Sequence, residues 1–161
     1  MKILISGSSG LIGKSLINFL ESKKHEIFIL TRNIKENSKN SIFWDPYKNI
    51  IDLNKIENFD VFINLNGSSI AKIMMLGRIK FGSKKSIYNS RIISTKFLRN
   101  CIEKLSNPPK LYMTASACGY YGDRGNLLVE ESSKPGLGFL SDTAKIWENI
   151  AIPDKKNVRV V

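Results

Sequence analysis

The segment GSSGLIGKS, residues 7–15, has the residue types and spacing of a phosphate-binding loop. One interpretation is a P-loop, whose pattern is Gly, four residues and then Gly-Lys-Ser/Thr, and which would bind ATP. The Gly-Lys-Ser end of that pattern is present, but its first glycine would fall on Ser8, and Gly7 lies one residue too early. The spacing therefore argues against a P-loop.

The same segment contains Gly7-x-x-Gly10-x-x-Gly13, a variant of the dinucleotide-binding fingerprint. Gly7 would permit a tight turn, Gly10 the close approach of a pyrophosphate, and Gly13 close packing of the helix on the sheet. The helix N-terminus would present free N–H groups and a partial positive charge to the phosphates. Because the apolar stretch KILIS precedes the loop and an amphipathic helix follows it, we favour this interpretation.

The end of the second predicted strand indicates which dinucleotide is bound. NAD-binding proteins usually carry an acid there that holds the ribose 2′-hydroxyl. This strand ends in Leu-Thr-Arg-Asn, with Arg32 and no acid. A guanidinium suits a 2′-phosphate, and one charge-assisted hydrogen bond of about 1.5–3 kcal/mol corresponds to a roughly ten- to hundred-fold preference for NADP. The alternative is a solvated surface arginine.

Strands that alternate with helices must position this loop. The hydrophobic pattern predicts helices over residues 11–23, 83–105 and 139–151, and strands over residues 2–6, 26–31, 41–44, 60–65, 110–114 and 157–161. Strands that are apolar along their length indicate a parallel sheet covered on both faces, which is a doubly wound α/β fold. The first helix is expected to face this sheet with Ile12, Leu16, Ile17 and Leu20.

The last predicted strand, residues 157–161, ends the chain. A parallel strand buried on both faces needs a following element to cover it. We therefore expect a truncated sequence in which residues 1–161 form an incomplete NAD(P)-binding Rossmann domain, without the smaller part that would bind substrate. The alternative is a short edge strand at a natural terminus.

The charge is unusual: the chain has a net charge of +11, and residues 61–102 contain no acid. Such a stretch could attract nucleic acid or an anionic ligand. No recognition helix or aromatic-interleaved motif accompanies it, so a nucleic-acid partner is not expected.

Other residue types exclude several classes of protein. Cys101 and Cys118 have no CxxC spacing, which indicates a reduced, cytoplasmic chain in which both are small core residues. The single histidine, His25, has no cluster of further ligands around it, so no metal site is expected. No apolar run approaches the roughly 18–20 residues that span a bilayer, so no membrane partner is expected. The sequence predicts no oligomeric state.

Several stretches of the chain resemble one family over essentially the whole length. The most specific are ASACGYYGDRG, residues 115–125, and Trp-Asp-Pro, residues 44–46, because neither follows from Rossmann geometry alone. KILISGSSGLIG, LTRN and INLNGSSIA also match. The chain resembles the extended short-chain dehydrogenase/reductases, in the atypical branch of epimerase family proteins. Members of this branch are much longer, which agrees with the expected truncation.

The resemblance implies which residues contact NADP. They are Gly7, Ser9, Gly10, Leu11, Ile12 and Arg32. It also implies that Asp45 lies near the adenine, and Asn66 and Gly67 near the nicotinamide-side ribose. The sequence departs from the family pattern at Asn66, where Ala is usual, at Ile79, where Trp is usual, and at Cys118, where Val is usual. None of these changes removes an identified cofactor contact.

In this superfamily a Tyr-x-x-x-Lys pair on one helical face moves the substrate proton while hydride passes to or from the nicotinamide. No such pair occurs here; counted from Glu148, its positions fall on Leu140 and Ala144. What remains after the fifth predicted strand is Ser116 with Tyr120 and Tyr121.

Two hypotheses follow for these residues. In the first, Tyr120 or Tyr121 is the acid/base and Ser116 orients the substrate. In the second, Gly-Tyr-Tyr-Gly shapes the loop and stacks on substrate or nicotinamide without proton transfer. The corresponding functions are an NADP-dependent oxidoreductase or epimerase, which acts on a small polar carbonyl or nucleotide-sugar-like substrate, and a non-catalytic NADP-binding regulator or redox sensor.

Overall fold

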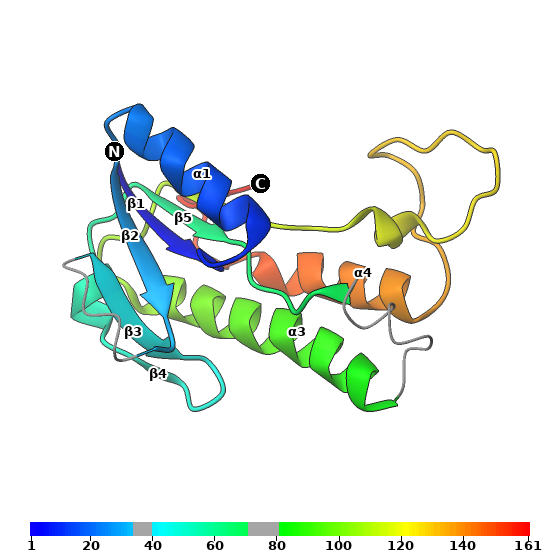
Figure 1. The fold of residues 1–161 in the computed structure, drawn as a ribbon, viewed down its shortest axis with the longest axis horizontal. Helices are drawn as coiled ribbons and strands as arrows, with labels where there is room; N and C mark the ends of the chain where they lie inside the picture. The colour runs from blue at the N-terminus through cyan, green and yellow to red at the C-terminus, as the bar shows by residue number, and fades with distance from the viewer. Residues whose placement is uncertain (34–39, 71–80) are drawn as a thin grey trace.

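The computed structural model describes residues 1–33, 40–70 and 81–161, in which seven strands form one sheet. Ile79 and the middle of the acid-free stretch lie outside these ranges. The strand order is β4-β3-β2-β1-β5-β6-β7 (Figure 1). The strands are β1 (Lys2–Ser6), β2 (Glu26–Thr31), β3 (Ser41–Asp45), β4 (Ile50–Ile51), β5 (Val61–Asn64), β6 (Leu111–Thr114) and β7 (Arg159–Val160).

All neighbouring strands are parallel except β3 and β4, which pair antiparallel. Without β4, the order is that of the doubly wound dinucleotide-binding fold, whose switch point lies between β1 and β5. The predicted fold class is therefore confirmed, with an antiparallel addition at one edge.

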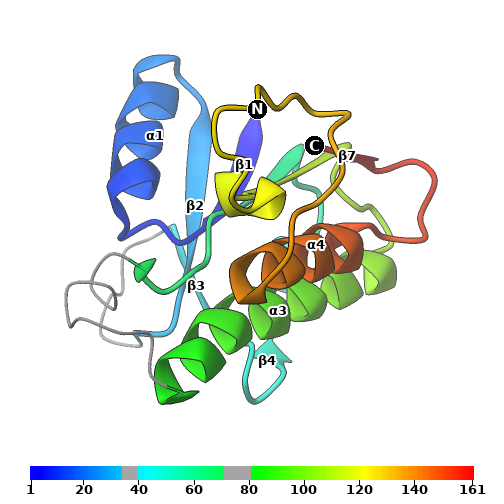
Figure 2. The same ribbon diagram turned by 90° about the vertical axis from the view of Figure 1, so that its right-hand side faces the viewer.

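Helices cover both faces of the sheet. In the described ranges these are α1 (Leu11–Ser22), α3 (Phe81–Lys104) and α4 (Phe139–Ala151), with 3₁₀ turns η1 (Leu53–Ile56) and η2 (Cys118–Tyr121). Figure 2 shows α1 on one face, and α3 and α4 side by side on the other. The segment between η2 and α4 arches away from the sheet (Figure 1). In these parts of the chain, no helix has the length and apolarity to cross a membrane.

Side chains of β1 enter two separate cores, because successive residues of a strand point to opposite faces. Ile3 and Ile5 face α1, whereas Leu4 belongs to the core under α3. The helix contributes Leu16, Ile17 and Leu20, as predicted. The prediction is wrong for Ile12, which is 68% exposed. At that end of α1 the nearest backbone is the glycine turn, which Gly13 contacts.

Two further expectations are corrected. The sheet is not wholly parallel, because the chain turns back after β3 into β4. The Asp45 carboxylate closes this turn by accepting the N–H groups of Tyr47 (3.0 Å) and Lys48 (3.3 Å). The sequence did not predict β4, because a two-residue strand is too short to show a hydrophobic period. Cys101 is buried as expected, but Cys118 is exposed, since it begins η2 beyond the end of β6.

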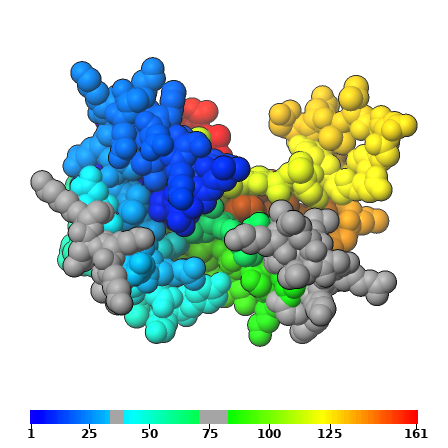
Figure 3. Space-filling model, viewed as in Figure 1, coloured from blue at the N-terminus to red at the C-terminus, as the bar shows by residue number. Residues whose placement is uncertain are grey.

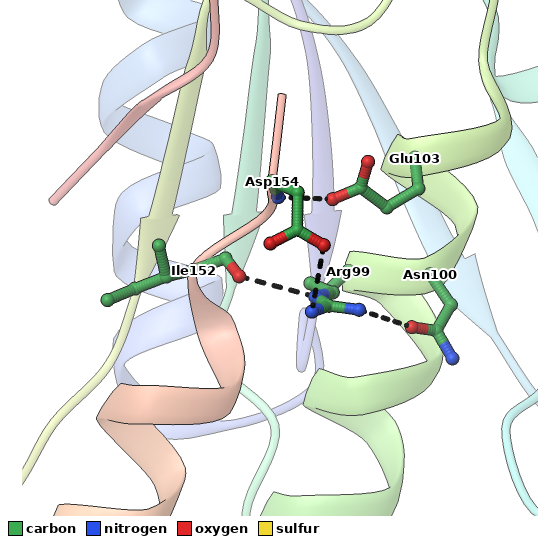
Figure 4. Close-up of polar contacts among 5 residues, drawn as sticks. All are labelled: Arg99, Asn100, Glu103, Ile152 and Asp154. Carbon is green, nitrogen blue, oxygen red and sulfur yellow. Dashed lines mark hydrogen bonds and ion pairs between the residues drawn. The ribbon is translucent and has the colours of Figure 1, made fainter. Parts of the chain in front are cut away.

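Polar contacts hold the connection from α4 to β7 against α3 (Figure 4). Arg99 Nε donates to the Ile152 carbonyl (3.2 Å), and Arg99 Nη2 lies 3.5 Å from the Asp154 carboxylate. Arg99 Nη1 donates to the Asn100 side chain, and the Asp154 N–H donates to the Glu103 carboxylate. Exposed ion pairs contribute little individually, so the main role of this group is to position the connection that leads to β7.

Candidate functional site

The glycine turn between β1 and α1 is closed by backbone contacts that exclude a side chain. Gly7 has a φ of +76°, and a Cβ there would lie 2.6 Å from the Leu65 carbonyl oxygen. A Cβ on Gly13 would lie 2.4 Å from the Gly7 carbonyl oxygen. Gly13 thus lets α1 approach the turn that directly follows β1. Gly10 is the N-cap of α1 and has no side chain to cap the free N–H groups.

A cavity of about 360 Å³ lies beside this turn, between the residues that follow β1 and β5. This is the switch point of the sheet, where doubly wound folds bind ligands. Six of the predicted cofactor residues line it: Gly7, Ser9, Gly10, Arg32, Asn66 and Gly67. Leu11 and Ile12 lie outside its wall and are 89% and 68% exposed. Their contacts with a cofactor remain predictions.

Arg32 and Asp45 differ in how available their charges are to a ligand. Arg32 is exposed on the cavity wall, and within the described ranges its guanidinium has no hydrogen-bond or ion-pair partner. Asp45 does not line the cavity; its carboxylate is occupied by the hairpin turn and lies 4.0 Å from Lys48 Nζ. Trp44 and Tyr47 from the same hairpin line the wall instead. The adenine contact implied for Asp45 stays a prediction.

Serine hydroxyls on α3 form a wall of the cavity that sequence reasoning missed. Ser86, Ser90 and Ser94 all line it, and their spacing of four residues puts them on one helical face. Ser90 Oγ accepts the N–H of Ser68 (3.0 Å), which joins α3 to the loop after β5. The repeated serine was visible in the sequence, but only the sheet topology shows that this face borders the glycine turn.

Residues after β5 are held by a buried hydrogen-bond network centred on Asn64. Asn64 Oδ1 accepts from Ser6 Oγ (2.8 Å) and from Asn66 Nδ2 (3.1 Å). Its Nδ2 donates to Thr95 Oγ1 (2.8 Å) and to the Tyr112 hydroxyl (3.3 Å). Burial raises the pKa of Tyr112 far above its ordinary value, so this hydroxyl is neutral. A buried amide with these bonds has little freedom, and it fixes Asn66 at the cavity wall.

The predicted catalytic residues meet in a second recess, of about 520 Å³. It is lined by Ser116, Tyr120, Tyr121, Glu131 and Glu148, among others. Ser116 Oγ donates a short hydrogen bond to the Glu148 carboxylate. The tyrosine rings pack edge to face with centroids 5.2 Å apart. In Figure 3 a hollow separates this part of the chain, in yellow, from the blue α1.

The second recess thus brings the three predicted residues together, while their catalytic roles remain predictions. Sequence reasoning gave Glu148 no role and used it only as the reference for counting the positions of the missing Tyr–Lys pair. Trp147 Nε1 donates to Thr95 Oγ1 (2.8 Å), which connects α4 to the network around the cavity. The positions counted for the missing Tyr–Lys pair, Leu140 and Ala144, line a third, apolar recess of about 200 Å³.

The chain is similar to proteins of one family. Residues 3–136 match the model of the NAD dependent epimerase/dehydratase family. Epimerase family protein YfhF of Bacillus subtilis is 32% identical over 151 residues, which are 92% of this chain and 48% of that protein. Epimerase family protein Mb2239 of Mycobacterium bovis is 31% identical over 160 residues, 99% of this chain and 51% of that protein. The chain therefore spans about half the length of these relatives.

Solved structures show the same relationship. The crystal structure of human epimerase family protein SDR39U1 with NADPH has a TM-score of 0.83 and 25% identity, covering 99% of this chain and 52% of that one. The nucleoside-diphosphate sugar epimerase from Corynebacterium glutamicum has a TM-score of 0.80 and 28% identity, covering all of this chain and 33% of that one. The family match extends from β1 through the glycine turn, the switch point and η2. This chain belongs to the NAD dependent epimerase/dehydratase family.

Proposed function

We propose that the cavity at the switch point binds NADP, with the pyrophosphate on the glycine turn and the 2′-phosphate on Arg32. The observation that carries this proposal is that one cavity collects Gly7, Ser9 and Gly10 from the turn, Arg32 from the end of β2, and Asn66 and Gly67 from the end of β5. The human relative crystallised with NADPH supports the choice of dinucleotide.

The electrostatics of the cavity favour an anion. The first turn of α1 contains no acid, and Gly10 leaves its N–H groups uncapped, so the positive end of the helix is available to phosphates. Arg32 is the only charged residue on the described wall of this cavity. The expected gain from one charge-assisted bond to a 2′-phosphate is about 1.5–3 kcal/mol, or roughly ten- to hundred-fold in affinity.

The corresponding activity is that of an oxidoreductase or epimerase acting on a small polar carbonyl or nucleotide-sugar-like substrate. NADP would supply or accept hydride at the substrate carbon. Tyr120 or Tyr121 would donate or take the proton at the substrate oxygen. Ser116, whose proton is donated to Glu148, would orient that oxygen by accepting a hydrogen bond from the substrate hydroxyl. Both tyrosines and Ser116 line one recess, which supports a shared role.

A second candidate function, a non-catalytic NADP-binding regulator, is favoured by one observation. The positions expected for a Tyr–Lys pair carry Leu140 and Ala144, which line an apolar recess and cannot transfer a proton. The two functions differ in turnover, not in cofactor affinity. A panel of small carbonyl compounds and nucleotide sugars, followed by loss of NADPH absorbance, separates them. Turnover that is lost in Tyr120→Phe or Tyr121→Phe supports the enzyme; turnover unchanged in both refutes the tyrosine assignment.

The NADP assignment is tested by titrating the protein with NADPH and NADH and following energy transfer from tryptophan to nicotinamide. Trp44 lines the cavity and is a suitable donor. We expect NADPH to bind about ten- to hundred-fold more tightly than NADH, and Arg32→Gln to abolish the difference. Arg99→Gln removes the same charge from α3 and is the matched control. Equal affinities in the unmodified protein would refute the 2′-phosphate contact.

A further inference from the structure

Arg91 on α3 is hydrogen-bonded to the loop that follows β5. Its Nη1 and Nη2 both donate to the Ser68 carbonyl, each at 3.3 Å, and Nη1 also donates to the Ile87 carbonyl one helical turn back (3.2 Å). A guanidinium is a planar fork of donors with a fixed geometry. Because the same group bonds the loop through two nitrogens and its own helix through one, it fixes where the Ser68 carbonyl lies relative to α3.

Ser68 is also held by α3 through its N–H group. That N–H donates to Oγ of Ser90, the residue before Arg91 (3.0 Å). Consecutive residues of one helix thus bind the N–H and the carbonyl of the same loop residue. Neither group can turn away without losing a bond, and bonds from a charged donor are stronger than neutral ones. Arg91 therefore supplies the stronger part of this anchoring.

Gly67 shows how closely the guanidinium approaches the loop. A Cβ at Gly67 would lie 3.1 Å from Cζ, 3.2 Å from Nη2 and 3.4 Å from Nη1 of Arg91, which are the three nearest atoms outside the adjacent residues. Gly67 does not belong to the glycines with positive φ, so its backbone conformation is open to other residues. The guanidinium, and not the backbone conformation, leaves no room for a side chain at this position.

Trp147 on α4 packs against the same guanidinium. The Arg91 Cζ atom lies 5.3 Å from the ring centroid, which is within the range of a cation–π contact. The indole is buried, and its Nε1 donates to Thr95 Oγ1 (2.8 Å), so the ring is itself held in place. The position of Arg91 is therefore set by both α3 and α4, which lie side by side in Figure 2.

The loop that Arg91 holds is one wall of the proposed NADP cavity. Asn66, Gly67 and Ser68 line this cavity, whereas Arg91 does not. Because the strand order is β2-β1-β5, the end of β2 with Arg32, the glycine turn and this loop follow one another along the edge of the sheet. A dinucleotide with its 2′-phosphate on Arg32 and its pyrophosphate on the turn would extend toward the loop. A wall that is already ordered binds better, since ordering it on binding costs free energy.

We propose that Arg91 is a positioning residue for the dinucleotide: it does not contact the cofactor, but holds Gly67 and Ser68 in the place from which they line the cavity. The role in cofactor binding rests on the proposed NADP function, whereas the anchoring of the loop does not. Both the donors and the flat shape of the guanidinium are used, and a lysine ammonium is a compact point charge. Lysine should therefore replace Arg91 only in part.

Hydrogen exchange measured by NMR tests the anchoring without any ligand. Arg91→Met keeps an unbranched side chain with good helix propensity and removes the donors and the charge. We expect the Ser68 amide of this variant to exchange at least about tenfold faster relative to the amides of β1, because the loop opens more easily. Arg99→Met removes a cation two turns further along α3 and should leave this ratio unchanged. An unchanged ratio in Arg91→Met overturns the proposal.

Titrations with NADPH and NADH, followed by nicotinamide fluorescence, test the consequence for the cofactor. Arg91→Met should weaken both by the same factor of about ten, because Arg32 still binds the 2′-phosphate, and Arg91→Lys should weaken both by less. Gly67→Ala alone should weaken NADPH at least about fivefold, but less than about twofold when added to Arg91→Met, whose flexible side chain can yield to the Cβ. Arg99→Met should bind like the unmodified protein.

Circular dichroism spectra and thermal midpoints establish that each variant is folded. If Arg91→Met does not fold, Arg91→Lys takes its place and must weaken both dinucleotides at least about threefold for the proposal to stand. An unchanged NADPH affinity in the folded variant overturns the proposal, as does an equal effect of Gly67→Ala with and without the guanidinium. A larger loss for NADPH than for NADH also overturns it, since Arg91 would then bind the 2′-phosphate directly.

Two results separate this inference from the proposed NADP function. NADPH binding that no Arg91 variant alters supports the NADP cavity and overturns the positioning role. Binding of neither dinucleotide by the unmodified protein refutes the NADP cavity and with it the positioning role; faster exchange of the Ser68 amide in Arg91→Met would then support only the anchoring of the loop.

Discussion

Replacing Thr95 by Val tests how strongly the buried network binds α4 to α3. Thr95 is fully buried, and its hydroxyl accepts hydrogen bonds from Asn64 Nδ2 and Trp147 Nε1, both at 2.8 Å. Valine has nearly the same shape but offers no acceptor. The indole N–H can only donate, so Trp147 is left without a partner. Asn64 Nδ2 still reaches the Tyr112 hydroxyl at 3.3 Å.

The expected cost follows from these contacts. A buried donor without an acceptor costs about 1–3 kcal/mol, and the loss of one of two bonds at Asn64 adds about 1 kcal/mol. Thr95→Val should therefore lower the free energy of unfolding by about 2–4 kcal/mol, which is a large share of the roughly 5–15 kcal/mol of a typical domain. Thr95→Ser keeps the hydroxyl and loses one methyl group, which should cost only about 1 kcal/mol.

Urea denaturation followed by circular dichroism measures these differences without relying on tryptophan emission. A double-mutant cycle with Trp147→Phe isolates the Thr95–Trp147 bond, because phenylalanine removes the orphaned donor. In that background, Thr95→Val should cost about 1–2 kcal/mol less than in the unmodified protein. If Thr95→Val is as stable as Thr95→Ser, or if the cycle shows no coupling, the network does not bear on the packing of α4.

Three other predictions concern the turn, the surface and the core. Gly13→Ala places a Cβ 2.4 Å from a backbone oxygen, so it should lower the free energy of unfolding by about 1–3 kcal/mol and weaken NADPH binding in a titration. Lys14→Ala, which a P-loop could not tolerate, should leave the NADPH affinity unchanged. Arg99→Ala should cost under about 1 kcal/mol in urea denaturation, because the Asp154 carboxylate of its ion pair is 88% exposed. Burial raises the pKa of Cys101 to about 11 in the folded chain, above its value of about 8.5 in the unfolded chain. The free energy of unfolding should therefore be constant below about pH 8.5 and should fall by roughly 1–3 kcal/mol as the pH rises from there toward 11. Denaturation at increasing pH should show this fall, and Cys101→Ala should lack it.

Local pattern was sufficient for most of the framework around the site. The predicted spans of β1, β2 and α4 coincide with Lys2–Ser6, Glu26–Thr31 and Phe139–Ala151. These elements are long enough to show a hydrophobic period, and glycines mark the turn between the first strand and helix. The two-residue β4 carries no such period, and the exposure of Cys118 depends on where η2 leaves the sheet. Sequence reasoning missed β4 because the strand is too short, and it missed the exposure of Cys118 because that exposure is set by the tertiary structure.

The sequence by itself determined the α/β order, the glycine turn with its spacing, and the cation at the end of β2, because each depends on residues close together in the chain. Only the tertiary structure decided which distant side chains meet. Ser116 bonds Glu148 across 32 positions, and Arg91 faces Trp147 from a different helix. Periodicity shows which side of a helix is buried, but the partner on the other side is set by strand order and by the packing of α3 against α4. For that reason the serine wall and the Asn64 network could be recognised only in the folded chain.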